Sequence, residues 1–331
     1  MNKDKNLIIP EKKTILVFGI SSLLGSSITE FLKKDYKVVG TYYKTRVSMP
    51  GVLTLPCDVL DKDQVQLMVY AFKPDITIYC VGVASVYACS RSEELADALN
   101  ASGLYNVAES CGRYRSQVIY FSSNFVFSGE PKNYMEMDIP DANTALGKTQ
   151  ASSEFFIQKT SLNYLVFRCC RIYGRGVNPL KMNWFYALQS KLSNREKFAC
   201  DDFIKVGFLD VYFLAMVVKI AIERGVTNRL FQISSSDQMS YFSFAKNYCK
   251  IFSESDDFLS RTKWPFPAIA SQGMSGVSDN LKYQMDITNI EGYLNIEMPT
   301  VLDSLQFTYQ RLGGNPENKG KMKKGEGVSF I

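Results

Sequence analysis

The stretch that decides the fold spans residues 14–25 and reads TILVFGISSLLG. Residues 14–18 are apolar or β-branched without alternation, which is typical of a strand buried on both faces of a parallel sheet. The strand ends at Gly19, and a helix is predicted at about residues 26–34. A buried strand, a glycine turn and a helix are the opening of a βαβ unit.

The same alternation continues outward along the chain. Strands are predicted at residues 37–41, 76–81, 118–122 and 164–168, and helices at residues 64–72, 93–111 and 152–159. Such alternation predicts an α/β fold with a doubly wound parallel sheet, the Rossmann architecture. We expect an N-terminal extension at 1–12, a Rossmann domain at 13–171, a smaller mixed region that mainly binds substrate at 172–312, and a flexible basic tail at 313–331. Some segments of the 172–312 region are expected to return to the Rossmann sheet.

Composition narrows the class of protein. The chain has 331 residues, of which 46% are hydrophobic and 21% charged, as in globular proteins. Its apolar runs are shorter than the ~20 residues that cross a bilayer, and the N-terminus lacks the apolar core of a secretory signal. We therefore expect a cytoplasmic protein without a membrane span. The net charge of +5 is weak support for nucleic-acid binding, so no such partner is expected.

Histidine and cysteine usage excludes several chemistries. The chain has no histidine, which removes Ser-His-Asp and Cys-His nucleophile systems and HExxH zinc sites. Its eight cysteines contain no CxxC pair, and several lie in apolar runs. We expect buried reduced thiols rather than disulfides, and no metal site.

The turn after the first strand is a candidate dinucleotide site. In GISSLLG, Gly19 lets the backbone approach a pyrophosphate and Gly25 allows close packing of the helix on the strand. Ser22 takes the place of the middle glycine of a GxxGxxG pattern. The candidate contacts are Gly19, Ser21, Ser22, Leu24 and Gly25. Two glycines at this spacing also occur in α/β turns that bind no nucleotide.

Two further segments bear on the cofactor. No acidic residue ends the second strand, whereas Lys44 and Arg46 follow it and could neutralise a ribose 2′-phosphate. This favours NADP over NAD, and the alternative is that both are solvated loop charges. Asp58 and Val59 follow another apolar stretch, where the carboxylate could meet an adenine amino group or cap the next helix.

The order of motifs resembles the extended short-chain dehydrogenase/reductases, and within them the dTDP-4-dehydrorhamnose reductase family, over about residues 13–312. The resemblance rests on Gly19 to Gly25, Cys57-Asp58, Lys73-Pro74-Asp75, Asn100, SSNFVFSG at 122–129, Tyr134-Met135-Glu136, LGKTQ at 146–150 with Glu154, and Arg168 with Ile172-Tyr173-Gly174. It implies binding of NADP(H) and a nucleotide-diphosphate sugar, and reduction of a 4-keto group.

The chain departs from this family at the catalytic pair. The resemblance implies a YxxxK motif, in which the tyrosine donates a proton and the lysine, four residues on along one helix face, lowers the phenol pKa. The matching positions are Leu146 and Gln150, which can do neither. Lys148 should lie on the opposite helix face. Ser123 persists at the position that polarises the carbonyl, although a strand-end hydroxyl can be purely structural.

Other matching residues have open roles. The resemblance places Asn124, Trp184 and Tyr186 at the substrate, where the aromatic rings could stack on a base or belong to the core. Tyr134 is a substitute acid only if its loop folds over the nicotinamide. Arg168, a charge in a buried strand, should be paired. The basic residue that the family has near 273–279 is not evident.

Two functional hypotheses follow. In the first, the chain binds NADP(H) and a nucleotide sugar without standard catalysis, as a binding or regulatory protein that forms a homodimer or joins a catalytic subunit. The regulatory subunit of methionine adenosyltransferase belongs to a similar branch, which makes such a role plausible. In the second, it is an active reductase or epimerase of a nucleotide-diphosphate 4-keto sugar in polysaccharide precursor synthesis, with Ser123, Tyr134 or water as the proton relay.

Overall fold

The main sheet of the protein has seven parallel strands. The structure is a computed structural model that describes residues 12–161, 163–176, 183–264 and 281–314, so the predicted N-terminal extension and basic tail lie almost entirely outside the described residues. The strand order is β12 (Arg229–Ile233), β7 (Tyr164–Cys169), β5 (Gln117–Ser123), β4 (Ile76–Tyr79), β1 (Thr14–Phe18), β2 (Lys37–Tyr42) and β3 (Leu53–Pro56). The order confirms the predicted doubly wound α/β fold.

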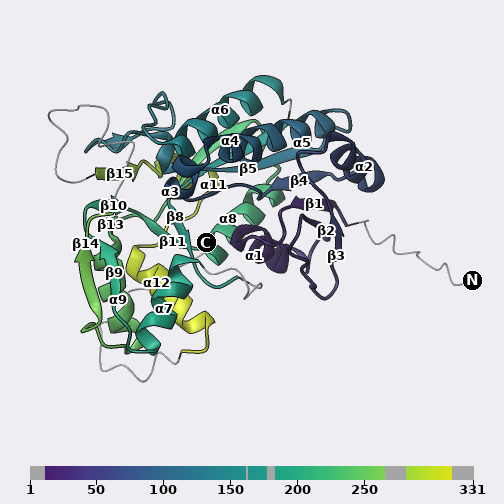
Figure 1. The fold of residues 1–331 in the computed structure, drawn as a ribbon. Helices are drawn as coiled ribbons and strands as arrows, with labels where there is room; N and C mark the ends of the chain where they lie inside the picture. Colours follow the sequence, from purple (N-terminus) through teal and green to yellow (C-terminus); the bar gives the residue numbers. More distant parts are fainter. Residues whose placement is uncertain (1–11, 162, 177–182, 265–280, 315–331) are drawn as a thin grey trace, which may run out of the picture.

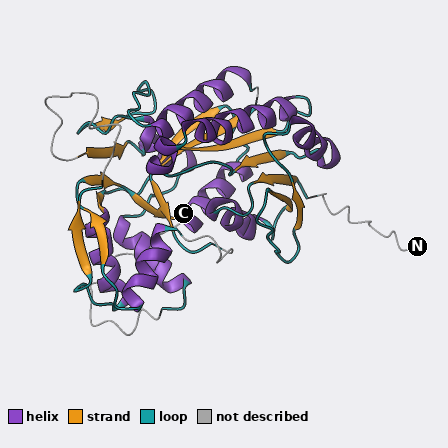
Figure 2. Ribbon diagram, in the orientation of Figure 1, coloured by secondary structure: helices purple, strands orange, loops and turns teal. Residues whose placement is uncertain are grey.

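The apolar strand residues form two cores, one on each face of this sheet. Ile15 and Val17 pack under α1 (Leu23–Leu32), α8 (Val211–Glu223) and α11 (Thr288–Leu294), whereas Leu16 and Phe18 pack against α2 (Lys62–Phe72), α5 (Gly103–Gly112) and α6 (Ala145–Thr160). Figures 1 and 2 show the sheet between these helix layers. Because every strand position is buried on one face or the other, the strands read as continuous apolar runs.

Two predicted helices differ from the structure. The helix predicted at 93–111 is interrupted: α4 (Glu93–Asp97) leads into a π-helical turn, η1 (Ala98–Ser102), before α5 begins, and a separate helix α3 (Val86–Arg91) precedes it. The helix predicted at 152–159 begins earlier, as α6 at Ala145, where the Thr144 side chain accepts a hydrogen bond from the backbone N–H of Gly147 at 3.0 Å. This cap sets the start of the helix that carries Leu146 and Gln150.

A second, smaller region packs around an aromatic core. Its strands are β6 (Asn133–Tyr134), β8 (Arg171–Tyr173), β9 (Phe198–Asp201), β10 (Ile204–Val206), β11 (Phe208–Asp210), β13 (Met239–Ser240), β14 (Leu259–Thr262) and β15 (Leu281–Met285), with helices α7 (Trp184–Ser193), α9 (Tyr241–Phe252) and α12 (Val301–Arg311). The chain passes between the regions more than once, because β6 lies in this small sheet whereas α8 and β12 return to the main sheet. Figure 1 shows the region below and to the left of the main sheet.

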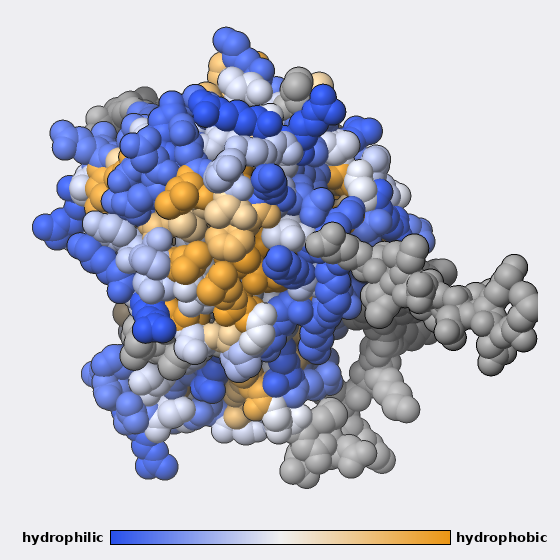
Figure 3. Space-filling view, turned by 90° about the vertical axis from the view of Figure 1, so that its right-hand side faces the viewer, coloured by the Kyte–Doolittle hydropathy of each residue, from blue (hydrophilic) through white to orange (hydrophobic). Residues whose placement is uncertain are grey.

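The surface and the thiols fit a globular protein. No helix among the described residues is long and apolar enough to cross a membrane. On the face drawn in Figure 3, an apolar area in the middle is surrounded by hydrophilic residues. All eight cysteines are free, and all except the half-buried Cys80 are buried, which confirms the expected reduced thiols.

Candidate functional site

A cavity of about 540 Å³ lies at the carboxyl edge of the main sheet. It is lined by residues that follow β1, β4, β5 and β7, and by side chains of α6, α7 and α9. Its position includes the point between β1 and β4 where the strand order reverses. Ligands of open α/β sheets bind at this kind of switch point.

The cavity brings together most of the predicted site residues. The ones that line it are Ser21, Ser22, Leu24, Ser123, Asn124, Leu146, Gln150, Trp184 and Tyr186. Gly19 and Gly25 shape the turn behind this lining. Lys44, Arg46, Asp58 and Val59 lie outside the lining, after β2 and β3.

The glycine turn is sterically fixed. Gly19 has φ +85°, and a Cβ there would lie 2.7 Å from the carbonyl oxygen of Cys80. A Cβ on Gly25 would lie 2.3 Å from the carbonyl oxygen of Gly19. Neither position accepts a side chain without displacement of backbone, so the turn between β1 and α1 keeps its tight form.

Ser22 closes this turn in place of a glycine. Its backbone is extended, with φ −77°, so no glycine is needed for conformation. The hydroxyl accepts a hydrogen bond from the Gly25 N–H at 2.9 Å and donates to the Gly19 carbonyl at 2.8 Å. Ser22 is thus the N-cap of α1, and this capped helix N-terminus faces the cavity with its positive dipole end.

Beside the positions that match the catalytic pair, a serine hydroxyl meets an amide, and neither Leu146 nor Gln150 is an acid. Ser123 Oγ donates a hydrogen bond to Gln150 Oε1 at 2.6 Å and accepts one from the Phe125 N–H at 3.2 Å. Leu146 lines the same cavity, and its side chain packs with Cys89 and Ala96. The site can therefore orient a polar group at Ser123, but neither Leu146 nor Gln150 can donate a proton as a phenol does.

Two other candidates for proton chemistry lie away from this point. Tyr134 does not line the cavity. It stacks on Phe127 with ring centroids 4.2 Å apart, and its hydroxyl accepts a hydrogen bond from the Gly129 N–H at 3.0 Å. Burial raises its phenol pKa. Lys148 is exposed, on the side of α6 away from the buried Leu146, as predicted.

Asn100 anchors one wall of the cavity. Its Oδ1 accepts a hydrogen bond from the Val83 N–H at 2.8 Å, and its Nδ2 donates to the Val83 carbonyl at 3.2 Å and to Thr149 Oγ1 at 3.1 Å. These bonds tie the π-helical turn to the segment after β4 and to α6. The asparagine therefore holds the wall in place, and it lies within the π-helical turn that interrupts the predicted helix.

We call the part of the cavity lined by the residues after β5, by β8 and by α7 its far half. This part contains buried polar groups without hydrogen-bond partners. Four buried polar atoms of its lining have no hydrogen-bond partner among the residues that the structure describes: Ser122 Oγ, Asn124 Nδ2, Arg171 Nε and Trp184 Nε1. Asn124 is only 2% exposed and Ser122 only 3%. Buried polar groups in native proteins are nearly always hydrogen-bonded. A ligand rich in acceptor oxygens would satisfy these four atoms.

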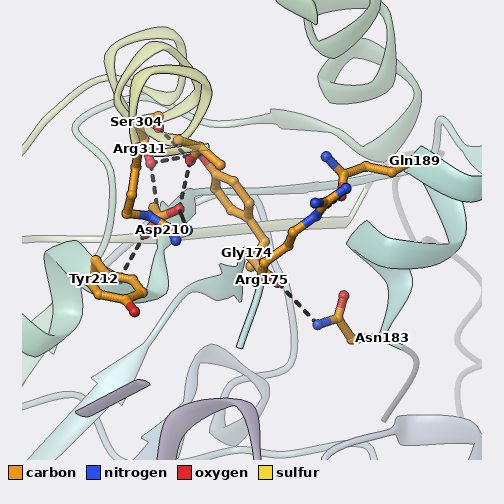
Figure 4. A network of polar contacts seen from close by, with 10 residues as sticks. Gly174, Arg175, Asn183, Gln189, Asp210, Tyr212, Ser304 and Arg311 are labelled. Atoms are coloured by element: carbon orange, nitrogen blue, oxygen red, sulfur yellow. Dashed lines mark hydrogen bonds and ion pairs between the residues drawn. The ribbon is translucent and has the colours of Figure 1, made fainter. Parts of the chain in front are cut away.

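Trp184 and Tyr186 stand at the start of α7, which two polar contacts hold against the strand pair β8–β11 (Figure 4). Asn183 caps the helix and donates from Nδ2 to the Gly174 carbonyl at 3.1 Å, and Arg175 Nε donates to Gln189 Oε1 at 2.8 Å. Trp184 is both core and cavity wall, since its ring packs against Tyr241 while lining the cavity. Tyr186 lines the cavity beside Arg175, whose guanidinium lies 5.5 Å from its ring.

A buried polar network connects the same strand pair to α12 (Figure 4). The Asp210 carboxylate, fully buried at the end of β11, accepts hydrogen bonds from the Tyr212 N–H at 2.8 Å and from Arg311 Nη2 at 2.9 Å. Ser304 Oγ in turn accepts from the Asp210 N–H at 2.9 Å. The network joins α12 to β11 and to the start of α8, so it fixes the position of α12 against these elements.

The residues after β2 and β3 have simple surroundings. Lys44 and Arg46 are exposed, and the Lys44 ammonium lies 5.0 Å from the Tyr43 ring. The Asp58 carboxylate accepts a hydrogen bond from the Leu60 N–H at 3.0 Å, whereas the N-cap of α2 is Asp61. The helix-cap alternative for Asp58 is therefore wrong, because the helix starts one turn later than that alternative requires.

Arg168 is paired, as its burial demands. Its guanidinium donates two hydrogen bonds to Glu154 Oε2, at 2.8 Å from Nη2 and 3.0 Å from Nε, and Nη1 donates to the Glu136 carbonyl at 3.1 Å. The pair links β7 to α6 and does not line the cavity. Arg168 is a structural residue.

Among the cavity residues that the sequence reasoning missed, two carry polar or charged groups of interest. Arg171 begins β8 and Tyr241 begins α9, and both line the cavity. Arg171 gave a signal that could have been used, because it lies three residues after a predicted strand, at the sheet edge where ligands bind. Tyr241 gave none, since its place in the wall depends on how the smaller region folds.

Comparison with known proteins identifies the family. Residues 13–300 match the sequence profile of the RmlD substrate binding domain family. The chain belongs to this family. The match covers both the Rossmann sheet and most of the smaller region, and it confirms the resemblance to extended short-chain dehydrogenase/reductases of the dTDP-4-dehydrorhamnose reductase type.

Relatives of known name align with part of the chain. The methionine adenosyltransferase 2 subunit beta of Bos taurus is 27% identical over 173 residues, which are 52% of this chain and 50% of the relative. The probable low-salt glycan biosynthesis reductase of Haloferax volcanii is 26% identical over 160 residues, 48% of this chain and 53% of the relative. The chain thus spans about half the length of the curated relatives it matches.

Solved structures share the whole fold. A dTDP-4-dehydrorhamnose reductase from Bacillus anthracis in complex with NADP superposes with a TM-score of 0.76 at 19% identity, over 91% of this chain and 99% of the other. A UDP-glucose 4-epimerase from Thermotoga maritima with UDP-glucose also has a TM-score of 0.76 at 19% identity, over 90% and 98%. At these identities the likeness shows the Rossmann-like fold.

Proposed function

We propose that this protein binds NADP(H) and a nucleotide-diphosphate sugar and lacks the standard hydride-transfer reaction, so that it acts as a binding or regulatory protein. The observation that carries the proposal is the pair Leu146 and Gln150, which stand in a retained cavity at the positions of the catalytic tyrosine and lysine. Loss of a positioned general acid typically lowers a rate by ~10²- to 10⁴-fold, whereas the groups that would bind ligands remain.

The half of the cavity lined by the turn between β1 and α1, which we call the near half, fits a dinucleotide. The turn at Gly19 and Gly25 leaves no room for side chains, and the capped N-terminus of α1 suits a pyrophosphate. NADPH would supply a hydride only in the second candidate function given below. The chain's own part is to hold the phosphates at Ser21, Ser22 and Leu24 and to present Ser123 to the second ligand. The NADP complex of the Bacillus anthracis structure supports this assignment.

The residues beyond the lining suit the adenosine end of NADP. Lys44 and Arg46 are exposed at the carboxyl end of β2, where a ribose 2′-phosphate would lie, and the strand ends without an acidic residue. Asp58 and Val59, after the adjacent strand β3, are the proposed adenine contacts. The exposed cations favour NADPH over NADH.

The far half is proposed to take the sugar nucleotide. Asn124, Trp184 and Tyr186 line it, and the first two carry unpartnered buried N–H groups. The UDP-glucose in the Thermotoga maritima structure supports a nucleotide sugar. One relative is by name a subunit of an adenosyltransferase, which supports a catalytic partner as the alternative to a homodimer.

The first test is a titration with NADPH and NADH, followed by nicotinamide fluorescence. We expect NADPH to bind at micromolar concentration and NADH more weakly. The variant Lys44→Gln/Arg46→Gln should lose affinity for NADPH by about tenfold or more and should no longer distinguish the two cofactors, because charge-assisted bonds to phosphate contribute ~1.5–3 kcal/mol.

Arg195→Gln/Lys197→Gln is the matched control, since these two exposed basic residues have the same spacing and lie outside the cavity lining. This control should bind both cofactors like the wild type. If the wild type binds neither cofactor, the proposed function is wrong. Equal affinity of the wild type for NADPH and NADH would show that Lys44 and Arg46 do not bind a 2′-phosphate.

A second candidate function is slow reduction or epimerisation of a nucleotide-diphosphate 4-keto sugar. The observation in its favour is the Ser123 hydroxyl, which lines the cavity. Its proton is donated to Gln150 Oε1, and rotation of the O–H toward a bound substrate would let it polarise a carbonyl while water relays the proton. NADPH oxidation with a dTDP-4-keto sugar, measured over hours at high protein concentration, tests it. Turnover that disappears in Ser123→Ala would favour this function over binding alone.

A further inference from the structure

We propose that Arg171 binds an oxyanion, a phosphate or a carboxylate, of the ligand in the far half of the cavity. The proposal deepens the proposed function and rests on it in one respect, that this half of the cavity takes a ligand. It adds a chemical requirement that the motifs do not contain: the ligand carries a negative charge.

The charge balance of the cavity is the first observation. Among the described residues that line it, Arg171 is the single charged side chain, and no carboxylate lines it. Arg171 makes no ion pair with another described residue, and its Nε is buried without a hydrogen-bond partner. An unpaired guanidinium in a partly buried site is costly unless an anion neutralises it.

The second observation is that Arg171 is held in place by an aromatic ring. Its guanidinium carbon lies 5.9 Å from the centroid of the Tyr241 ring, and the Trp184 ring lies 5.0 Å from the same centroid in an edge-to-face contact. All three residues line the cavity. Stacking against Tyr241 restricts the guanidinium and leaves its N–H groups for a ligand, while the indole N–H of Trp184 is a further unsatisfied donor nearby.

The third observation is that Arg171 and Ser123 line the same cavity. In the main sheet Ser123 pairs with Cys169, and Arg171 follows Cys169 by two residues. The two residues therefore come from the same edge of neighbouring strands, and one ligand in the cavity can contact both.

The segment in which the resemblance places a basic residue does not supply one. Residues 265–280 contain no lysine or arginine, although the resemblance places a basic residue near 273–279. The oxyanion is then either the diphosphate of a nucleotide sugar or the carboxylate of an acidic sugar. Both are planar or tetrahedral acceptors that a guanidinium binds with two N–H groups.

The test is isothermal titration of the full-length protein, saturated with NADPH, with UDP, dTDP, UDP-glucose, UDP-glucuronate, free glucuronate and inorganic phosphate. We expect the wild type to bind at least one of them, and Arg171→Gln to bind it at least about tenfold more weakly, with Arg171→Lys between the two. Raised salt should weaken the wild type more than Arg171→Gln. Arg229→Gln is the matched control, because Arg229 also lies over a tyrosine ring, 5.0 Å from the centroid of Tyr293, but outside the cavity lining.

The arms separate the two sources of the oxyanion. If the diphosphate is bound, the loss in Arg171→Gln is the same for UDP or dTDP alone as for the sugar nucleotides. If a sugar carboxylate is bound, only UDP-glucuronate or glucuronate is affected. Equal affinities of wild type and Arg171→Gln for every ligand that binds would overturn the proposal, and so would a wild type that binds NADPH but none of the panel. A wild type that does not bind NADPH is a different result, which rejects the proposed function itself.

Discussion

At the scale of single residues, Ser123 lines the cavity, whereas Leu146 and Gln150 occupy the two positions that match the catalytic pair. We expect Leu146→Tyr/Gln150→Lys to gain reduction of a dTDP-4-keto sugar by NADPH, with a rate ~10²- to 10⁴-fold above that of the wild type, because it supplies a phenol and a cation beside Ser123. Leu146 and Gln150 both line the cavity, so the new side chains would face it. NADPH oxidation at 340 nm measures the gain.

The control for this gain is Leu146→Phe/Gln150→Lys, which adds the ring and the charge without the hydroxyl. It should stay as slow as the wild type. Leu146 packs with Cys89 and Ala96, so near-UV circular dichroism must show that both variants keep the fold. If the tyrosine variant folds, binds NADPH and turns nothing over, the sugar half of the cavity has changed as well as the catalytic pair.

Single residues were predictable where a motif fixes their place relative to the sheet. Ser123 ends β5, and Leu146 and Gln150 lie one turn apart on α6, so the sequence order alone brings them to one edge. Arg171 was not identified, because its importance lies in the absence of any other charge on the cavity wall. The position of Arg171 shortly after a strand is visible in the sequence, whereas the absence of other charges on the wall is a property of the folded surface.

At the scale of elements, the buried pair of Arg168 and Glu154 joins β7 to α6. Their side chains are 4% and 2% exposed. We expect Arg168→Met to lower the free energy of unfolding by about 3–5 kcal/mol, because the Glu154 carboxylate would stay buried without a cation. Urea unfolding followed by circular dichroism measures the change.

The double variant Arg168→Met/Glu154→Leu should recover a large part of this loss, since no charge is then left uncompensated. The exposed pair of Lys62 and Glu109 is the comparison, and Lys62→Met should cost less than about 1 kcal/mol. If the double variant is as unstable as the single one, the ion pair is not what holds β7 to α6.

Elements were predicted well where their hydrophobic pattern is complete in itself. The strands at 14–18, 37–42 and 164–169 are buried on both faces and read as apolar runs, and they lie where expected. The π-helical turn at Ala98–Ser102 was not predicted, and its Asn100 side chain bonds to Val83, a contact between segments 17 residues apart. Local propensity carries no signal for such a contact.

At the scale of the whole molecule, the two regions are built from interleaved pieces of chain. Strand β6 crosses to the smaller sheet and pairs with β15, about 150 residues later, and β12 returns to pair with β7. The aromatic core of the smaller region includes Phe185, Phe208 and Phe244, from separate helices and strands. The aromatic residues of this core are visible in the sequence. The pairing of the strands around it is not, because short strands with long connections have many alternative partners.

The same interleaving buries the thiols, and this gives a test of the whole fold. Burial raises the pKa of Cys57, Cys170 and Cys200 to about 12 and that of Cys89, Cys111 and Cys249 to about 11. At pH 8 a thiol of pKa 11 is about one part in a thousand thiolate, and the thiolate is the reactive form. We expect the native protein to react with Ellman's reagent over hours, whereas all eight cysteines react within minutes in guanidinium. Because the raised pKa values lie above the assay range, each step of one pH unit between 7 and 9 should increase the native rate about tenfold.

NADPH connects this measurement to the proposed site. Cys80, Cys169 and Cys170 line the cavity, and burial raises the pKa of all three thiols. A ligand that fills the cavity should therefore slow the native reaction further at these positions, and mass spectrometry of the labelled peptides identifies which thiols respond. Cys57, Cys200 and Cys249 do not line the cavity and are the internal controls, since their rates should change only if the ligand stabilises the whole fold against opening. Rapid labelling of two or more cysteines in the native protein at pH 8 would contradict the packing described for both regions.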